Sequence, residues 1–162
     1  MTRLTLLFIC ECLLFFIPLN IYVIGDHEAN GVQWALFRFQ ESSLGNSLIL
    51  VNKDIHYVTG GILKGSSAYA TIIWVLGACL LVAAFIILGF AVARHDPTLT
   101  KSAGLLTIAC GALFLIAMLV QYGLFFANDH GSSVPVGVPL ILFIGIWLFA
   151  GEFEDRYREP IG

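Results

Sequence analysis

The sequence predicts a membrane protein of the all-α class: a four-helix bundle with a small extracellular antiparallel β-sheet between helices 1 and 2. Of its 162 residues, 59% are hydrophobic and 12% are charged, a balance outside the range of soluble globular domains. Four apolar runs each approach the roughly 20 residues that a helix needs to cross the hydrocarbon core of a bilayer. One long polar stretch separates the first two runs. We therefore expect residues 1–162 to form a single four-span membrane domain.

Prolines and small residues shape the four expected spans. Pro18 lacks a backbone N–H and is expected to kink the outer half of the first span. Pro97 disfavours helix at the residue before it, which ends the second span. In the third span Ala103, Thr107 and Gly111 are spaced by four, so they form one face of small residues that allows close helix packing. We place the spans at about residues 4–24, 67–93, 102–127 and 135–152.

The long outer segment, residues 31–61, is expected to form β-structure. Residues 48–59 are dense in the β-branched and aromatic residues typical of strands. Residues 52–54 form a short connection within this run, which predicts a hairpin. Helix competes with strand for residues 31–40, whose aromatic residues also fit a helical spacing. We predict three antiparallel strands, at residues 32–40, 47–52 and 55–59.

The basic residues near the span ends predict the orientation, because cytoplasmic connections carry an excess of Lys and Arg. Three basic residues lie in the long segment and five lie at the opposite span ends. The first group is Arg38, Lys53 and Lys64; the second is Arg3, Arg94, Lys101, Arg156 and Arg158. We therefore expect a multi-pass protein of the cell membrane with both termini cytoplasmic and residues 31–61 outside.

Glu11 is the most notable polar residue within a span, because an ionisable group there is costly and is a functional candidate by default. It could be a proton or cation site, or an anchor for a lipid headgroup or a partner helix. Alternatively, it is protonated, or hydrogen-bonded to Thr107 at a comparable depth of the third span. Gln121 is a third intramembrane polar residue, which could bond to Asn20 as an interhelical contact.

Two histidines near the outer surface are candidates for a metal site. His27 lies between two acidic residues after the first span, and His130 follows Asp129 after the third. Imidazoles and carboxylates could bind zinc or copper. Polar residues that end helices at the headgroup boundary explain the same pattern, so we predict no resident metal and no cofactor.

Several function classes are excluded by the same reading. The net charge of −3 and the absence of a basic run argue against a nucleic-acid partner. The sequence contains no nucleophile motif, phosphate-binding glycine loop or paired-carboxylate pattern, so we predict no catalytic residues and no enzymatic activity. All four cysteines lie in apolar runs, which gives no disulfide framework for the outer segment.

The predicted topology resembles that of claudins and peripheral-myelin proteins. Residues 31–37, GVQWALF, are similar to the Gly-Leu-Trp segment of that family. The cysteine pair in the family's first loop is absent here, so the resemblance rests on topology. It implies a membrane protein that acts through lateral and extracellular contacts.

We therefore predict a non-enzymatic membrane protein that self-associates or assembles through its outer segment, with the lipid bilayer and either itself or another membrane protein as partners. Trp34, Phe37 and Phe39 are the predicted contact residues, since aromatic side chains dominate interface energetics. Two other functions stay open. The protein could be an accessory subunit of a larger membrane complex, or a small ion or proton carrier that uses Glu11.

Overall fold

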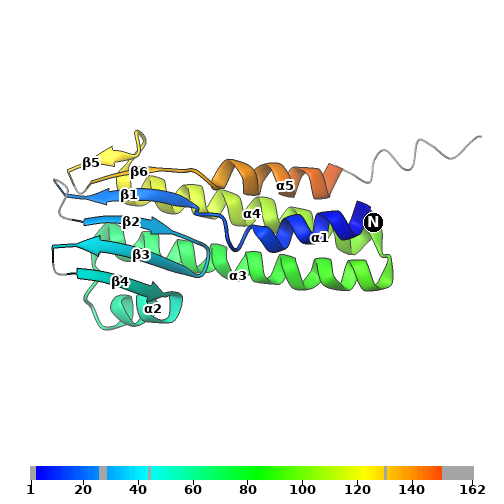
Figure 1. Ribbon diagram of the computed structural model, residues 1–162, viewed down its shortest axis with the longest axis horizontal. Helices are drawn as coiled ribbons and strands as arrows, with labels where there is room; N and C mark the ends of the chain where they lie inside the picture. The colour runs from blue at the N-terminus through cyan, green and yellow to red at the C-terminus, as the bar shows by residue number, and fades with distance from the viewer. Residues whose placement is uncertain (1–2, 26–28, 44, 130, 151–162) are drawn as a thin grey trace, which may run out of the picture.

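The computed structural model of the protein describes residues 3–25, 29–43, 45–129 and 131–150. Within these residues the chain forms five helices and one six-stranded antiparallel sheet (Figure 1). The helices are α1 (Arg3–Leu13), α2 (Val51–Thr59), α3 (Gly65–Arg94), α4 (Pro97–Tyr122) and α5 (Val138–Ala150). The strands are β1 (Asn20–Ile24), β2 (Ala29–Gln33), β3 (Phe37–Ser42), β4 (Gly45–Leu50), β5 (Ala127–Asn128) and β6 (Gly131–Val134).

The predicted fold class, an all-α four-helix membrane bundle with a small sheet, is wrong. The sheet of the described chain has six strands from two separate parts of the sequence, β1–β4 before α2 and β5–β6 after α4, so helix and sheet are both major components. Among the described residues, two helices, α3 with 30 residues and α4 with 26, are long and apolar enough to span a membrane. Helix α1 has 11 residues and α5 has 13, which are shorter than the roughly 20 residues of a span.

The predicted first span, residues 4–24, divides into a helix and a strand because of Pro18. The helix tightens after Leu13, where the N–H of Phe16 bonds to the carbonyl of Leu13 at 2.9 Å. A proline disfavours helical backbone at the residue before it, so the helix cannot continue through Ile17. The sequence after Pro18 is rich in β-branched residues, and residues 20–24 pair as the central strand β1.

The outer segment 31–61 also differs from the prediction of three strands. The predicted strand 32–40 is interrupted after Gln33 by a turn, in which the N–H of Trp34 donates to the carbonyl of Phe37 at 2.8 Å. The predicted strand 47–52 corresponds to β4, whereas the predicted strand 55–59 lies in helix α2. Val51, Ile55 and Val58 have the i, i+4, i+7 spacing of a helix face, and this period outweighs their β-propensity.

The strand order of the sheet is β4-β3-β2-β1-β6-β5, with every neighbouring pair antiparallel. Strand β6 follows α4 in sequence but pairs with β1, so the two halves of the chain meet in the centre of the sheet. The sheet lies at one end of the molecule, against one side of α3 and α4 (Figure 1). The described ends of α1 and α5 lie at the opposite end.

The helices pack through the small residues that the spacing predicted. Ala103 and Thr107 are fully buried, and Gly111 lies where an added Cβ would be 2.8 Å from the Leu142 side chain of α5. The prediction of one close-packing face on α4 is confirmed. On α3, Gly77 lies under the ring of Phe114, which fills the space that a larger side chain would need.

Candidate functional site

The sheet has two different faces. The inner face packs on α3 and α4, whereas the outer face carries no helix over it in the described chain (Figure 1). Successive residues of a strand point to opposite faces, so the register assigns each side chain to one of them. The inner face is mainly polar, and the outer face carries an apolar row.

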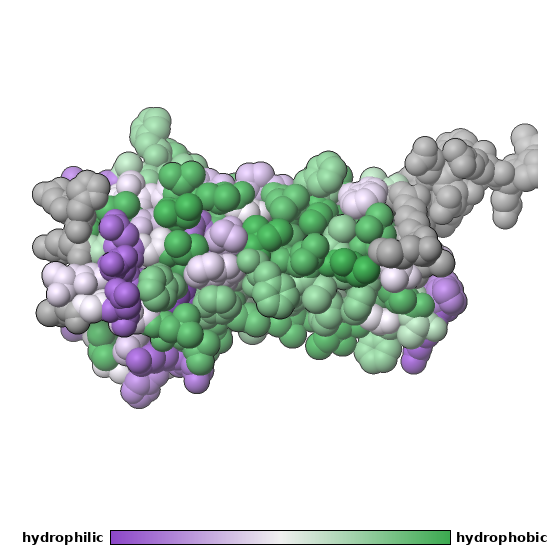
Figure 2. All heavy atoms as spheres, viewed as in Figure 1, coloured by the Kyte–Doolittle hydropathy of each residue, from purple (hydrophilic) through white to green (hydrophobic). Residues whose placement is uncertain are grey.

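The apolar row is a line of five side chains that runs across the outer face in register. Ile21 pairs with Val134 on one side and with Val32 on the other, and the line continues through Phe39 to Leu48. Val134, Ile21, Phe39 and Leu48 keep 62, 48, 37 and 59% of their surface exposed. Figure 2 shows a hydrophobic band across this face beside a hydrophilic band nearer the far end of the sheet. Two residues along the strands from Val32, Phe39 and Leu48, the paired positions on the same face are Asn30, Glu41 and Asn46.

The three predicted contact residues lie in different surroundings. Phe39 belongs to the apolar row and is exposed. The Trp34 and Phe37 rings stack on each other with centroids 4.8 Å apart. The Trp34 indole N–H donates to the carbonyl of Phe16 at 3.1 Å, and the Trp34 carbonyl accepts from Trp74 at 3.2 Å. Trp34 thus joins the sheet to the end of α1 and to α3.

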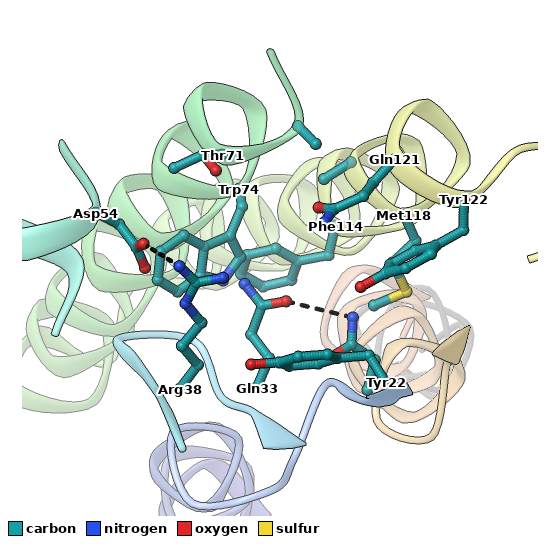
Figure 3. Close-up of a pocket in the computed structure, with 13 residues that line it drawn as sticks. Tyr22, Gln33, Arg38, Asp54, Thr71, Trp74, Phe114, Met118, Gln121 and Tyr122 are labelled. Atoms are coloured by element: carbon teal, nitrogen blue, oxygen red, sulfur yellow. Dashed lines mark hydrogen bonds and ion pairs between the residues drawn. The ribbon is translucent and has the colours of Figure 1, made fainter. Parts of the chain in front are cut away.

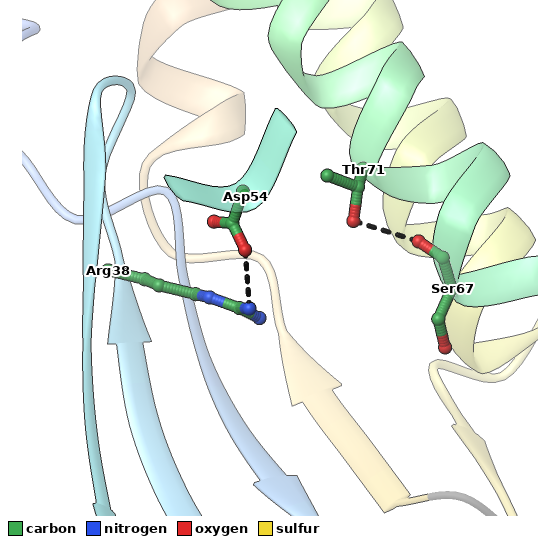
Figure 4. A network of polar contacts seen from close by, with 4 residues as sticks. All are labelled: Arg38, Asp54, Ser67 and Thr71. Carbon is green, nitrogen blue, oxygen red and sulfur yellow. Dashed lines mark hydrogen bonds and ion pairs between the residues drawn. The ribbon is translucent and has the colours of Figure 1, made fainter. Parts of the chain in front are cut away.

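On the inner face, Arg38 of β3 faces Asp54 of α2. The Arg38 guanidinium donates to Asp54 Oδ1 at 2.6 Å, and the two side chains are 17 and 2% exposed (Figure 4). Burial raises the pKa of the Asp54 carboxyl above its ordinary value, while the charge and hydrogen bond of Arg38 act in the opposite direction. Across from this pair, the Thr71 hydroxyl of α3 donates to the Ser67 carbonyl at 2.8 Å.

Tyr22 of β1 covers the neighbouring strand. Its ring lies against Gly31, its partner in β2, and a Cβ at that position would overlap the ring. Glycine is therefore required for the ring to lie across the sheet. The pKa of Tyr22 is raised, chiefly by burial, so its hydroxyl stays neutral.

Glu11 and Thr107 are brought together in the helical layer. Both are fully buried, and the Thr107 hydroxyl oxygen lies 2.7 Å from Glu11 Oε1, within hydrogen-bonding distance. This is the contact that the sequence offered as the structural alternative for Glu11. Glu11 Oε2 is buried and has no hydrogen-bond partner among the described residues.

The remaining predicted residues are only partly placed. Gln121 lies beside the inner face of the sheet and lines the same cavity as Asn20 (Figure 3). The Asn20 amide donates to Gln33 Oε1 at 3.3 Å, not to the predicted partner Gln121. His27 and His130 lie outside the described residues, and within those residues no cluster of three potential metal ligands occurs.

Sequence reasoning missed the polar cluster of the inner face. Arg38 and Asp54 are separated by 16 residues and are joined only because α2 folds back beside the sheet. The available signal was at Arg38 alone, which lies between two phenylalanines and so points away from their face.

The comparisons with known proteins give no family. No protein-family model matches the chain, and no curated protein matches it in sequence. The similarity to claudins and peripheral-myelin proteins therefore stays a prediction, as do the contact and intramembrane roles of the residues above.

Proposed function

We propose that this protein is a non-enzymatic membrane protein that assembles with copies of itself through the outer face of its sheet. Helices α3 and α4 cross the bilayer, with mean hydropathies of 2.8 and 2.5 over their most apolar windows. The sheet then stands at one membrane surface, next to the ends of both spans (Figure 1). The claudin-like mode of action that the sequence suggested, lateral contact through an outer β segment, fits this arrangement.

We infer that the sheet is outside the cell. The turn between α3 and α4 is at the end away from the sheet, and Arg94 and Lys101 flank it. On the sheet side the basic residues are Arg38, Lys53 and Lys64. The described ends of α1 and α5 lie at the same end as the turn, so α1 and α5, with the residues that join them to the sheet, also pass through the bilayer beside α3 and α4. In the sequence, Arg3 and the Arg156 and Arg158 that follow α5 then join Arg94 and Lys101, and by the positive-inside rule five basic residues against three favour a cytoplasmic α3–α4 turn and cytoplasmic termini in the cell membrane.

The observation that carries the proposal is the apolar row. An isolated exposed apolar residue needs no explanation, but a continuous line across five paired strands is a surface that water does not favour. The visible surface of the helical layer is also largely hydrophobic, as Figure 2 shows. A two-fold axis through the outer face would place the apolar row of one copy against the apolar row of another. Two-fold symmetry is the commonest symmetry of soluble homo-oligomers.

The test compares two variants, one with a carboxylate in the apolar row and one with a carboxylate beside it. Leu48→Glu adds a carboxylate to the apolar row, whereas Asn46→Glu adds one to the same face of the same strand, two residues away. Both side chains are exposed, so both variants should fold. We expect Leu48→Glu to weaken self-association about tenfold or more, because a charge in an apolar contact must be desolvated. Asn46→Glu should associate as the native chain does.

The measurement is the fraction of oligomer against protein concentration in lipid nanodiscs or mild detergent, by cross-linking or fluorescence transfer between labelled copies. A native chain that stays monomeric at all concentrations would rule out self-assembly. Equal effects of the two substitutions would show that the apolar row is not the contact.

A further inference from the structure

Two neighbouring cavities lie between the inner face of the sheet and helices α3 and α4. The first is a small cavity of about 20 Å³, bordered by sheet residues and backed by Trp74, Phe114 and Met118 (Figure 3). The second is an open cleft of about 500 Å³ nearer the far end of the sheet. Arg38, Thr71 and Gln121 line both, so they form the wall that the two spaces share.

Three polar atoms that border the small cavity lack a hydrogen-bond partner among the described residues. They are Asn20 Oδ1, the Tyr22 hydroxyl and Arg38 Nε. Asn20 and Tyr22 are each 2% exposed, so bulk water does not reach them. Leaving a buried polar group without a partner costs free energy, so three such groups around one cavity indicate that the cavity holds an occupant.

The chemistry of these atoms defines the group that fits. Arg38 Nε is a donor, Asn20 Oδ1 is an acceptor, and the Tyr22 hydroxyl can be either. A carboxylate or phosphate would meet Asn20 Oδ1 and the nearby Asp54, and an ammonium group would meet the Arg38 guanidinium. The Arg38–Asp54 pair leaves little net charge. An uncharged group that both donates and accepts satisfies all three atoms, and the cavity has room for one such oxygen.

The open cleft is also lined by polar groups that can donate or accept hydrogen bonds. Its lining includes the amides of Gln40 and Gln121, the Ser67 hydroxyl and the Asp129 carboxylate, with Ile24 and Leu63 as apolar surface. Ile24 is the last residue of β1 and Asp129 directly follows β5, so the cleft lies toward the end of the sheet away from α1 and α5. Its volume is within the range of small-molecule sites, about 300–1,000 Å³.

We propose that this cleft binds a small, neutral, soluble polyhydroxy compound, a sugar or polyol, with one hydroxyl seated in the small cavity. That hydroxyl accepts from Arg38 Nε and from the Tyr22 hydroxyl, and it donates to Asn20 Oδ1. This binding function is separate from assembly, because the cleft faces the helices and the apolar row faces the other way.

The experiment uses the full chain in phosphatidylcholine nanodiscs with glycerol, myo-inositol and galactose as probes, and succinate and ethanolamine as charged probes of similar size. Binding is followed by saturation-transfer NMR and calorimetry. We expect at least one neutral probe to bind and neither charged probe to bind more tightly. Tyr22→Phe removes the hydroxyl that borders the small cavity, and should weaken binding about tenfold.

The matched control is Tyr69→Phe, which removes the hydroxyl of an exposed tyrosine on α3 outside both cavities and should leave binding unchanged. If Tyr22→Phe fails to fold, Gln121→Met removes the amide in the shared wall and should weaken binding in the same way. The proposal is overturned if no neutral probe binds, if a charged probe binds best, or if the folded cavity variant binds as the native chain does. Loss of binding with assembly intact separates this site from the apolar row.

Discussion

The Thr107 hydroxyl has only one proton to donate, and this fact predicts whether the neighbouring Glu11 is protonated. Two acceptors lie within reach of the Thr107 oxygen: Glu11 Oε1 at 2.7 Å and the Ala103 carbonyl at 3.0 Å. One proton cannot serve both acceptors. If Glu11 is protonated, it donates to the Thr107 oxygen and Thr107 donates to the Ala103 carbonyl, so both contacts are hydrogen bonds. We therefore expect a neutral Glu11, seen at neutral pH as the C=O stretch of a protonated carboxyl in the infrared spectrum. Glu11→Gln should remove this band.

The same pair gives a stability control. Glu11→Gln keeps a donor for Thr107 and should change the free energy of unfolding by less than about 0.5 kcal/mol. Thr107→Val removes the hydroxyl and should cost about 1 kcal/mol, the size of an interhelical hydrogen bond in a membrane protein. A proton or cation flux into liposomes that depends on Glu11 would contradict this structural role and favour the carrier alternative.

Asp54 predicts a pH dependence with a definite sign. Burial raises the pKa of Asp54 in the folded protein above its ordinary value of about 4, despite Arg38. The folded state thus binds the proton more readily than the unfolded chain, so this group adds stability as the pH falls toward about 4 and loses it as the pH rises through the folded-state pKa. The measurement is the difference in unfolding midpoint between the native chain and Asp54→Asn at each pH. A difference that changes in the opposite sense would show that the attraction of Arg38 outweighs burial.

At the scale of elements, the α4–α5 contact depends on glycine. A Cβ at Gly104 would lie 2.7 Å from the backbone nitrogen of Phe149 and 3.0 Å from the carbonyl oxygen of Gly145, and backbone cannot move aside as a flexible side chain can. We expect Gly104→Ala to lower the free energy of unfolding by about 1–3 kcal/mol. Gly89→Ala on α3 is the matched control, because its nearest neighbour is Phe8 Cε2 at 3.6 Å. It should be neutral or stabilising by up to about 1 kcal/mol, and a similar loss in both variants would remove the packing explanation.

The long helices were the predictable elements, and the reason is their length. The runs at 67–93 and 102–127 correspond to α3 and α4 with shifts of a few residues at the ends, because a long apolar run has few other ways to satisfy its backbone. Short elements are harder to predict, because few residues define their pattern. Residues 51–59 combine strand-forming residues with a helical spacing, and the contact of α2 with α3 favours the helix. Residues 20–24 form a strand because β2 and β6 lie on either side of them, which local sequence cannot show.

At the scale of the whole molecule, both candidate sites depend on pairings between distant residues. The apolar row needs Val134 beside Ile21, and the polar cavity needs Arg38 beside α2 and below α3. Sequence reasoning found one member of the row, Phe39, and two residues that line the cavity, Asn20 and Gln121. It could not predict which other residues lie beside them, because the register of the sheet and the return of the chain after α4 are long-range contacts without a local signal.

The orientation of the whole molecule can be tested with two exposed positions at its opposite ends. Asn46 lies in β4, and Thr98 lies in the first turn of α4, at the turn away from the sheet. In a chain whose four native cysteines are replaced by alanine, each position is changed to cysteine and treated with a membrane-impermeant maleimide. Two spans with the sheet outside predict that Asn46→Cys reacts in intact cells and Thr98→Cys reacts only after permeabilisation. Reaction of both positions in intact cells would show that α3 and α4 do not separate them by a bilayer, and the reverse pattern would place the sheet in the cytoplasm, where an extracellular ligand or contact could not reach it.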